Sequence, residues 1–319
     1  MSTAMRVMTV TIYLFLFVLT GFVSSLEAMS WPCEDAELIR NFGSNEKGKP
    51  TLGMVFAGNT EVLAAETGEI IFSRGSGNDA SRLPSPLGAW TAIDHGDGLI
   101  SIYSRYSDKT AASVWTNSII TSESDVQNFA IAGNFIEKSQ PIASSGISGW
   151  SKQNGFYFII YDRRERRWIN PAMIVTPARN TSSLQILSVE LLNTQGVPVS
   201  SRNLTQGRYT IYVDTTAAPA ARASAAAQQP SLSKHAPQRI VCSVNGAEAG
   251  SLNFEAVSAR DGVLMVYRNG LVPVGRIYSH YPAFETADVY LSRGQVNIEV
   301  IVQDAAGNTS SVVNRLIVN

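Results

Sequence analysis

The chain has 319 residues, and its 25 basic and 26 acidic residues leave a formal net charge of −1. This balance excludes long-range electrostatic attraction to nucleic acid, so nucleic acid is not expected as a partner. Charged residues make up only 16 % of the chain, against roughly 25 % in an average soluble domain. Together with 45 % hydrophobic residues, this composition favours an exported, β-rich protein of about two domains.

The first residues have the pattern of a secretory signal. Arg6 precedes an almost wholly apolar stretch over residues 7–23, and small residues follow at Ser24, Ser25 and Ala28. Cleavage after Ser25 or Ala28 would remove this leader. An uncleaved stretch of about 17 apolar residues would instead be long enough to anchor the chain. Residues 1–28 are therefore predicted as a signal peptide or anchor, and a membrane is expected as a partner only through an uncleaved segment.

The following residues predict one small β domain over 45–177. Residues 33–42 allow a short helix, with Glu34 and Asp35 placed favourably near its N-terminus. The turn from Asp94 to Gly98 carries glycines and short acidic side chains, which supply the positive φ values of a tight hairpin. Turn residues separate short runs of β-forming residues at 61–65, 69–74, 89–94, 99–106 and 155–162.

Residues 183–319 repeat this β pattern with the spacing of a β-sandwich. The final run alternates apolar and polar residues about a turn at 304–308, as in the last hairpin of an immunoglobulin-like domain. Residues 215–237 are rich in Ala and Pro, and we expect a flexible, exposed loop there. The predicted fold class is therefore all-β. The candidate strands of this half are 184–192, 207–214, 239–244, 252–257, 263–267, 287–291, 297–303 and 311–318.

Residue types that catalyse reactions or bind metals are few and widely spaced. The histidines are His95, His235 and His280, and the cysteines are Cys33 and Cys242. A zinc site needs three or four convergent ligands, and no pair of these residues has metal-binding spacing. The sequence therefore predicts no metal and no cofactor. An oxidising compartment would permit one disulfide, and two unpaired buried thiols are the alternative.

Residues 51–177 resemble the lysostaphin/LytM-type zinc endopeptidases, a family with a small β fold that cuts peptidoglycan cross-links. The resemblance is most specific in TAIDHGDGLISIY at 91–103. It extends in the same order to EVLAAETGEIIFSR at 61–74, FIEKSQPIASSGISG at 135–149 and GFYFIIYDRRERRWINP at 155–171. The resemblance implies a LytM-like fold for this part of the chain.

The functional residues of the family do not carry over. Its His-x-Gly-x-Asp motif corresponds to Thr51-Leu52-Gly53-Met54-Val55, and its Tyr-x-His to Tyr103-Ser104-Arg105. Its final His-x-His corresponds to Phe156-Tyr157-Phe158. Side chains two apart on a strand share a face, so Phe156 and Phe158 are expected to fill the former metal cavity beside Thr51 and Val55. Without ligands, zinc cannot activate water, and the domain is predicted not to be an enzyme.

Two groups of residues are candidates for binding. Arg105, Tyr103, Phe156 and Phe158 are typical anchors for a peptide or a partner segment, although the two phenylalanines also suit ordinary core packing. An arginine-rich hairpin tip ending at Trp168 could bind anionic wall polymer or phospholipid headgroups, or form a solvated turn paired internally with Asp162 and Glu165. Its arginines are Arg163, Arg164, Arg166 and Arg167. The second half has four tyrosines that could line a recognition face or pack partly buried in the sandwich. They are Tyr267, Tyr278, Tyr281 and Tyr290.

These observations favour an exported, non-catalytic protein of a bacterial periplasm or cell envelope. The expected partners are peptidoglycan or a cell-wall hydrolase, because degenerate LytM-like proteins include activators of wall amidases. Two alternatives remain open. One is an active zinc endopeptidase with displaced ligands, and the other is a structural or adhesive envelope protein whose β domains both serve protein contacts.

Overall fold

The computed structural model describes residues 28–46, 48–75, 85–107, 135–175, 183–200, 204–218, 235–280 and 282–319. Nearly all regular structure in these ranges is β, which confirms the predicted all-β class. The predicted leader at 1–28 falls outside the described residues except for Ala28. Within the described ranges, no helix is long and apolar enough to cross a membrane.

The N-terminal unit is built on one antiparallel sheet with the order β9-β6-β7-β8-β11, in which β4 and then β1 continue from the first half of β11. A two-stranded sheet, β5-β10, contributes Val62 and Ile142 to the core beneath it. The elements are β1 (Glu37–Arg40), β2 (Asn45–Glu46), β3 (Lys49–Pro50), β4 (Met54–Ala57), β5 (Glu61–Leu63), β6 (Gly68–Arg74), β7 (Ala89–Asp94), β8 (Leu99–Tyr106), β9 (Phe135–Ile136), β10 (Pro141–Ser144), β11 (Gly155–Asp162), β12 (Arg167–Ile169) and the 3-10 turn η2 (Pro171–Met173).

Several sequence predictions for this unit are confirmed and one is wrong. The strands predicted at 89–94, 99–106 and 155–162 match β7, β8 and β11 residue for residue. In the hairpin between β7 and β8, Gly96, Asp97 and Gly98 all have positive φ, as expected. The helix allowed at 33–42 does not form. Its centre is strand β1, because pairing with β4 satisfies backbone groups that a short isolated helix would leave marginal.

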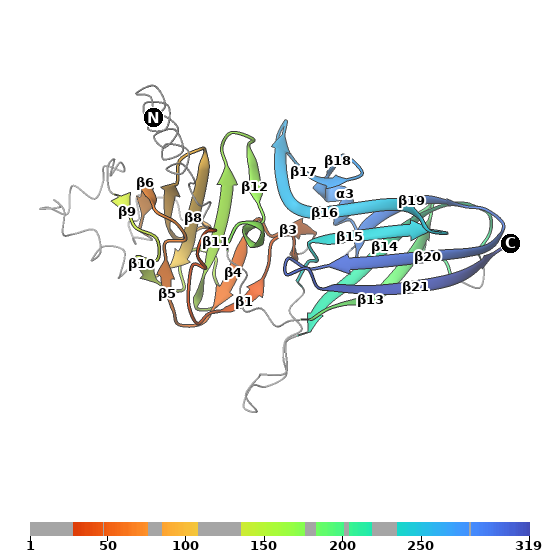
Figure 1. Ribbon diagram of the computed structural model, residues 1–319, viewed down its shortest axis with the longest axis horizontal. Helices are drawn as coiled ribbons and strands as arrows, with labels where there is room; N and C mark the ends of the chain where they lie inside the picture. The colour runs from red at the N-terminus through yellow and green to blue at the C-terminus, as the bar shows by residue number, and fades with distance from the viewer. Residues whose placement is uncertain are drawn as a thin grey trace, which may run out of the picture.

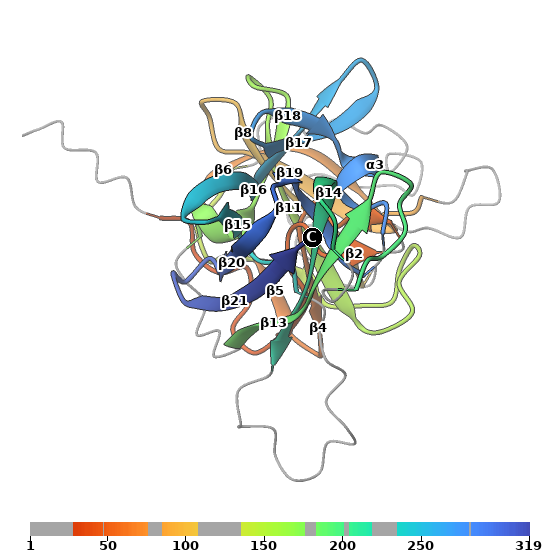
Figure 2. The same cartoon turned by 90° about the vertical axis from the view of Figure 1, so that its right-hand side faces the viewer.

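The C-terminal unit is a sandwich of two sheets around one core, as its strand spacing predicted. Sheet β13-β14-β19 packs against a sheet formed by β15, β16, β17, β20 and β21, and Figure 2 looks along both layers from the C-terminal end. Alternation sets the faces: every second residue of β20 from Val296 to Val302 is buried. The elements are β13 (Ser183–Asn193), β14 (Gly207–Ala218), β15 (Arg239–Val244), β16 (Ala247–Arg260), β17 (Val263–Arg268), β18 (Leu271–Pro273), α3 (Val274–Ile277), β19 (Phe284–Leu291), β20 (Gly294–Gln303) and β21 (Thr309–Val318).

The prediction of a flexible loop at 215–237 is wrong at both ends of that range. Residues 215–218 continue strand β14, where they pair with the start of β13. His235 is only 6 % exposed, and its Nε2 lies 3.1 Å from the carbonyl oxygen of Leu38. Small side chains extend a strand as readily as they form a loop when a partner strand is present. The remainder, 219–234, lies outside the described residues.

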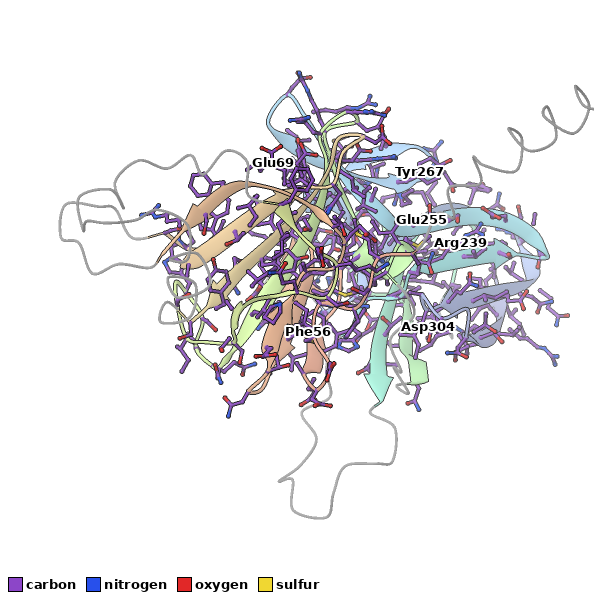
Figure 3. The ribbon with its side chains drawn as sticks, turned by 60° about the vertical axis from the view of Figure 1, so that its left-hand side comes forward. Phe56, Glu69, Arg239, Glu255, Tyr267 and Asp304 are labelled. Carbon is purple, nitrogen blue, oxygen red and sulfur yellow. The ribbon has the colours of Figure 1, made fainter. Side chains whose placement is uncertain are left out.

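The two units share a continuous sheet. Strand β12 pairs with β11 on one side and with β16 of the sandwich on the other, with Trp168 opposite Val257. Figure 1 shows β12 and β16 at the centre of the elongated molecule, where the units meet. Beyond β12, the Asn170 backbone N–H donates to Glu255 O at 2.8 Å; Figure 3 labels Glu255 in the C-terminal unit and Phe56 among the strands of the other.

A segment near the start of the chain crosses the same boundary. Phe42 is fully buried in the core of the C-terminal unit, although it lies two residues after β1. The side-chain amide of Asn41 makes two hydrogen bonds with the backbone of Ala236. Its Nδ2 donates to the carbonyl oxygen at 2.7 Å, and its Oδ1 accepts from the backbone N–H at 2.8 Å. The hydroxyl of buried Tyr278 donates to the carbonyl oxygen of Gly43 at 2.5 Å. The core of the C-terminal unit therefore depends on residues from the start of the chain.

Replacing Phe42 with Ala should destabilise the C-terminal unit. The ring has no exposed surface, and deleting such a ring from a packed core costs about 3–5 kcal/mol. Urea unfolding followed by circular dichroism measures this loss. Phe135→Ala is the matched control: its ring is 74 % exposed, and the change should stay within about 0.5 kcal/mol. Equal effects of the two substitutions would contradict the crossing segment.

Candidate functional site

A line of side chains crosses the N-terminal sheet on the face opposite its core. Val55 on β4 lies opposite Tyr157 on β11, Tyr157 opposite Ser104 on β8, and Ser104 opposite Trp90 on β7. Directly opposed residues of antiparallel strands point to the same face. Arginines end the line on β1 and β6. We call the line the outer row, and it consists of Arg40, Val55, Tyr157, Ser104, Trp90 and Arg74.

The prediction that Phe156 and Phe158 share a groove with Val55 is wrong. Phe156 is opposite Phe56, and Phe158 is opposite both Met54 and Tyr103, so these five side chains turn to the face opposite that of Val55. There they are buried in the core of the unit. Ring centroids lie 4.7 Å apart for Phe56 and Phe156, which stack. The alternative reading of the two phenylalanines, ordinary core packing, is confirmed.

Arg105 interrupts the alternation of side chains along β8. Its φ is 66°, in the left-handed region, and the pairing of β7 with β8 shifts register at this point. Tyr103 and Tyr106 are both buried in the core, so the two residues between them, Ser104 and Arg105, share the outer face, as a β-bulge allows. Left-handed backbone in a residue other than glycine costs on the order of 1–3 kcal/mol.

The Arg105 side chain lies against the outer row with its hydrogen-bonding capacity partly unused. Its guanidinium carbon is 5.1 Å from the centroid of the Tyr157 ring, within range of a cation–π interaction. Its backbone N–H donates to the carbonyl of Leu87 at 2.8 Å. Among the described residues, the buried Nε has no hydrogen-bond partner, and neither have the buried hydroxyls of Ser104 and Thr51.

Tyr157 ties the entry of β4 to this face. Its hydroxyl accepts a hydrogen bond from the backbone N–H of Leu52 at 3.0 Å. Burial raises the pKa of Tyr157 to about 12, so the phenol is neutral at neutral pH. A Cβ on Gly53 would lie 2.2 Å from the carbonyl oxygen of Phe158 and 2.9 Å from the Tyr157 ring. Glycine is therefore required where this segment meets β11, and Thr51 and Val55 flank that contact.

Tyr103 lies in the core and not on the outer row, and its hydroxyl takes part in two hydrogen bonds there. The hydroxyl accepts a hydrogen bond from Ala65 N at 2.7 Å, and burial raises the pKa of Tyr103 to about 12. The Ser101 hydroxyl donates to it at 3.2 Å and lies 2.7 Å from His95 Nε2. His95 thus connects its turn to the core, a role that its position in a Gly-rich turn did not indicate, and burial lowers its pKa.

The arginine-rich hairpin tip is an exposed turn paired with aspartates. Asp162 accepts hydrogen bonds from the backbone N–H groups of Arg164 and Glu165 and from Arg167 Nε, which lies 3.2 Å away. A second set of pairs reaches the neighbouring hairpin: Arg164 contacts Asp97 at 2.8 Å, and Arg163 contacts Asp94 at 3.5 Å. The predicted pairing of the arginines with Asp162 is found for Arg167. For Glu165, the contact found in the described residues is its backbone N–H, which donates to Asp162. Arg166 adopts a positive φ at the tip, and Trp168 packs toward the sandwich core.

The two cysteines lie in different cores. Cys33 is buried in the N-terminal core and Cys242 in the C-terminal core, and both are free thiols. Burial raises the pKa of Cys33 to about 11 and that of Cys242 to about 12, so neither forms a reactive thiolate at neutral pH. Of the two alternatives for these residues, the unpaired buried thiols are confirmed.

The zinc that the family resemblance implies does not fit the residues present. The segment that would hold two ligands offers Thr51 and Val55, and the outer face of β11 offers Tyr157 and Ile159. None of these side chains is a thiolate, imidazole or carboxylate, the groups that bind zinc in proteins. In the part of the chain that the structure describes, no cluster of three His, Cys, Asp or Glu side chains is placed to hold a metal ion.

Sequence reasoning missed a network of charges on the outer side of the sandwich. Glu285 is buried and accepts hydrogen bonds from Arg268 and Arg276, both at 2.5 Å, and from the hydroxyl of Tyr212 at 3.0 Å. Asp288 bridges the same two arginines, at 2.9 and 2.6 Å. These residues come from three separate strands and α3, so no spacing along the chain could have indicated them.

The tyrosines proposed as a recognition face are not brought together. Tyr278 is buried in the sandwich core, and Tyr267 and Tyr290 are half-exposed on different strands. Tyr281 lies outside the described residues. Beside Tyr290, a pocket of about 460 Å³ opens on strands β14 and β19, and its lining consists of Thr194, Arg208, Tyr209, Thr210, Asp288, Val289 and Tyr290.

Comparison with known proteins gives weak likenesses. A family model without a functional description matches residues 183–319. Among curated proteins, no sequence matches this chain significantly.

The similar solved structures include peptidases and a pore-forming complex. A zinc-containing peptidase from Vibrio cholerae is 18 % identical with a TM-score of 0.32, and the match covers 43 % of this chain but only 37 % of that one. The SpoIIQ–SpoIIIAH pore-forming complex matches at 17 % identity and TM-score 0.33, over 49 % of this chain and 95 % of that chain. The catalytic domain of the M23 protein EnpA from Enterococcus faecalis matches at 16 % identity and TM-score 0.31, over 45 % and 94 %. At these scores the likenesses do not assign the chain to a family.

Acid should weaken the charge network through Asp288. Burial alone would raise the pKa of this carboxyl, but the hydrogen bond from Thr210 and the charges of Arg268 and Arg276 lower it below 3.8. A lowered folded-state pKa contributes stability above the unfolded value, about 3.9, and that stability is lost as pH falls through the folded value.

Urea unfolding of wild type and Asp288→Asn over this pH range tests the network. The asparagine variant should be less stable at neutral pH, and its stability should fall less steeply below about pH 4. Asp261→Asn is the control because no ion pair of Asp261 is found among the described residues. Parallel acid limbs for wild type and Asp288→Asn would contradict this role.

Proposed function

We propose that this protein is an exported, non-catalytic LytM-like protein of a bacterial cell envelope, which binds peptidoglycan or regulates a cell-wall hydrolase. The proposal rests on the resemblance of four sequence segments to the LytM-type domain. It is carried by one structural observation: the guanidinium of Arg105 lies over Tyr157, on the strand face that carries Val55, which corresponds to a ligand position of the family motif. The outer row thus offers a half-buried aromatic and cationic surface, which suits binding.

Electrostatics argues against hydrolysis at this surface. A guanidinium and a divalent cation on the same face of a sheet repel each other, and the repulsion grows as water is excluded. Thr51, Val55, Tyr157 and Ile159 provide no strong ligand to offset it. Without a bound metal, the pKa of water stays near 15.7 and no nucleophile forms at neutral pH.

One observation favours the structural or adhesive alternative. Among the strands of the described ranges, β21 pairs only with β20 and so forms an edge of the sandwich sheet. Its outward side chains include Val313, 52 % exposed, and Ile317, 69 % exposed. An unpaired edge with apolar side chains is a site where another strand can add. This alternative predicts binding to a protein in the envelope rather than to the wall itself.

Binding to isolated sacculi tests the proposal. Purified protein without its leader should sediment with sacculi, contain no stoichiometric zinc, and release no soluble muropeptides. A parallel assay measures whether the protein changes the rate at which a wall amidase digests the same sacculi. Stoichiometric metal together with released muropeptides would establish the endopeptidase alternative. Failure to sediment with sacculi or affect the amidase would overturn the proposal and leave the adhesive alternative.

Restoring ligands on the correct strand face should create a metal site. The variant Thr51→His/Val55→Asp/Tyr157→His/Ile159→His places three of its new ligands on the outer face and the fourth on the segment that enters β4. We expect it to retain zinc after dialysis. The control variant keeps the first two changes but replaces Phe156 and Phe158 with His. It should bind no zinc and should lose about 3–5 kcal/mol of stability per buried ring. Equal zinc contents in the two variants would contradict a former metal site on the outer face.

A further inference from the structure

Arg105 combines features that are unfavourable in the protein by itself. Its backbone has a φ of 66°, which glycine or asparagine would adopt with less strain. Its Nε is buried without a hydrogen-bond partner among the described residues. A ligand that accepts hydrogen bonds from the guanidinium would contribute binding free energy, and this gain would offset the cost of the strained backbone and of the unpaired donor.

The groups around Arg105 are donors that lack an acceptor. The hydroxyl of Ser104, the preceding residue on the same face, is buried and also unpartnered within the described ranges. The acidic side chain of Glu46 is already paired with Arg40 at 2.8 Å. A guanidinium matches a planar, negatively charged acceptor, and a carboxylate fits this description best.

A carboxylate suits the site better than a phosphate does. A phosphate near neutral pH carries up to two negative charges, and its binding sites usually gather several cations. Of the arginines on the outer row, Arg40 is paired with Glu46, and Arg74 has interactions of its own. Arg105 therefore offers one positive charge, which balances the single charge of a carboxylate.

Exposed apolar side chains lie on a loop that is bonded to the same backbone segment as Arg105. The backbone of Arg105 is fixed to Leu87, and the loop between β10 and β11 packs on the same segment, where Trp150 N donates to the carbonyl of Pro86 at 3.2 Å. In that loop Ile147 is 67 % exposed and Trp150 is 72 % exposed. Exposed apolar side chains beside a charged anchor favour a ligand with an apolar group near its carboxylate.

We infer that Arg105, supported by the ring of Tyr157, forms a receptor for the terminal carboxylate of a peptide. The guanidinium binds the carboxylate, Tyr157 supports the guanidinium from behind, and the rim at Trp150 contacts the last side chain. The inference deepens the proposed function, on which it rests for the biological source of the peptide. Its chemistry can be tested separately.

Two probes that differ in one group test the receptor. N-acetyl-alanyl-alanine carries the terminal carboxylate, and its C-terminal amide does not. The protein used is the chain without its predicted leader. We expect it to bind the acid at least about tenfold more tightly than the amide, because the amide lacks a charge-assisted hydrogen bond. Isothermal titration calorimetry measures the affinities, and the ¹H–¹⁵N signal of Arg Nε reports whether Arg105 is engaged. Inorganic phosphate is the third probe and should bind more weakly than the acid.

Variants separate binding from folding. Arg105→Gly removes the guanidinium and relieves the positive φ, so it should be at least as stable as wild type yet lose the preference for the acid. Arg105→Lys keeps the charge and should retain only part of the preference. Arg164→Gln, at an exposed ion pair with Asp97, is the control and should leave the binding unchanged.

The outcomes distinguish this inference from the proposed function. Equal binding of acid and amide, undetectable binding of both, tighter binding of phosphate, or an unchanged preference in Arg105→Gly would each overturn the carboxylate receptor. If sacculi sediment wild type and Arg105→Gly alike while the probes fail, the wall function stands without the receptor. If the acid binds through Arg105 but sacculi do not, the receptor stands and its peptide belongs to a protein.

Discussion

The cross-strand register of β11 determines what the N-terminal unit can do. With Tyr157 fixed between Val55 and Ser104, every neighbouring side chain is assigned either to the core or to the outer row. A register shifted by one residue would exchange the two sets, moving Phe156 and Phe158 to solvent and Tyr157 into the core. The burial of those two rings, which are among the largest fully buried side chains of the described residues, disfavours the shift.

Alternation made much of this fold predictable. The strands at 89–94, 99–106 and 155–162 follow from β-forming residues bounded by turn residues, and the hairpin at Asp94 follows from its glycines. Those signals are local, so no tertiary information is needed to read them. The same locality explains the error at 33–42, where acidic residues favourable to a helix were overruled by the pairing of β1 with β4.

The candidate site was only partly predictable because its decisive features are not local. Arg105 was singled out from the sequence, but the bulge that turns it to the outer face appears only when β7 and β8 pair. Motif alignment alone predicts Phe156 and Phe158 in the groove, one residue out of phase with the face that carries Val55. The network around Glu285 forms only where residues from β14, β17, α3 and β19 meet. The spacing of these residues along the chain does not predict that contact.

The shared strand pairing at β12 and β16 fixes more than the interface between two units. A hinge would require breaking those hydrogen bonds and withdrawing Phe42 from the far core, so the two units move as one body. An object held on the face that carries Arg105 is then kept at a set distance and orientation from the tip of the sandwich. A ligand bound by Arg105 would therefore keep one distance and one orientation relative to the far end of the sandwich.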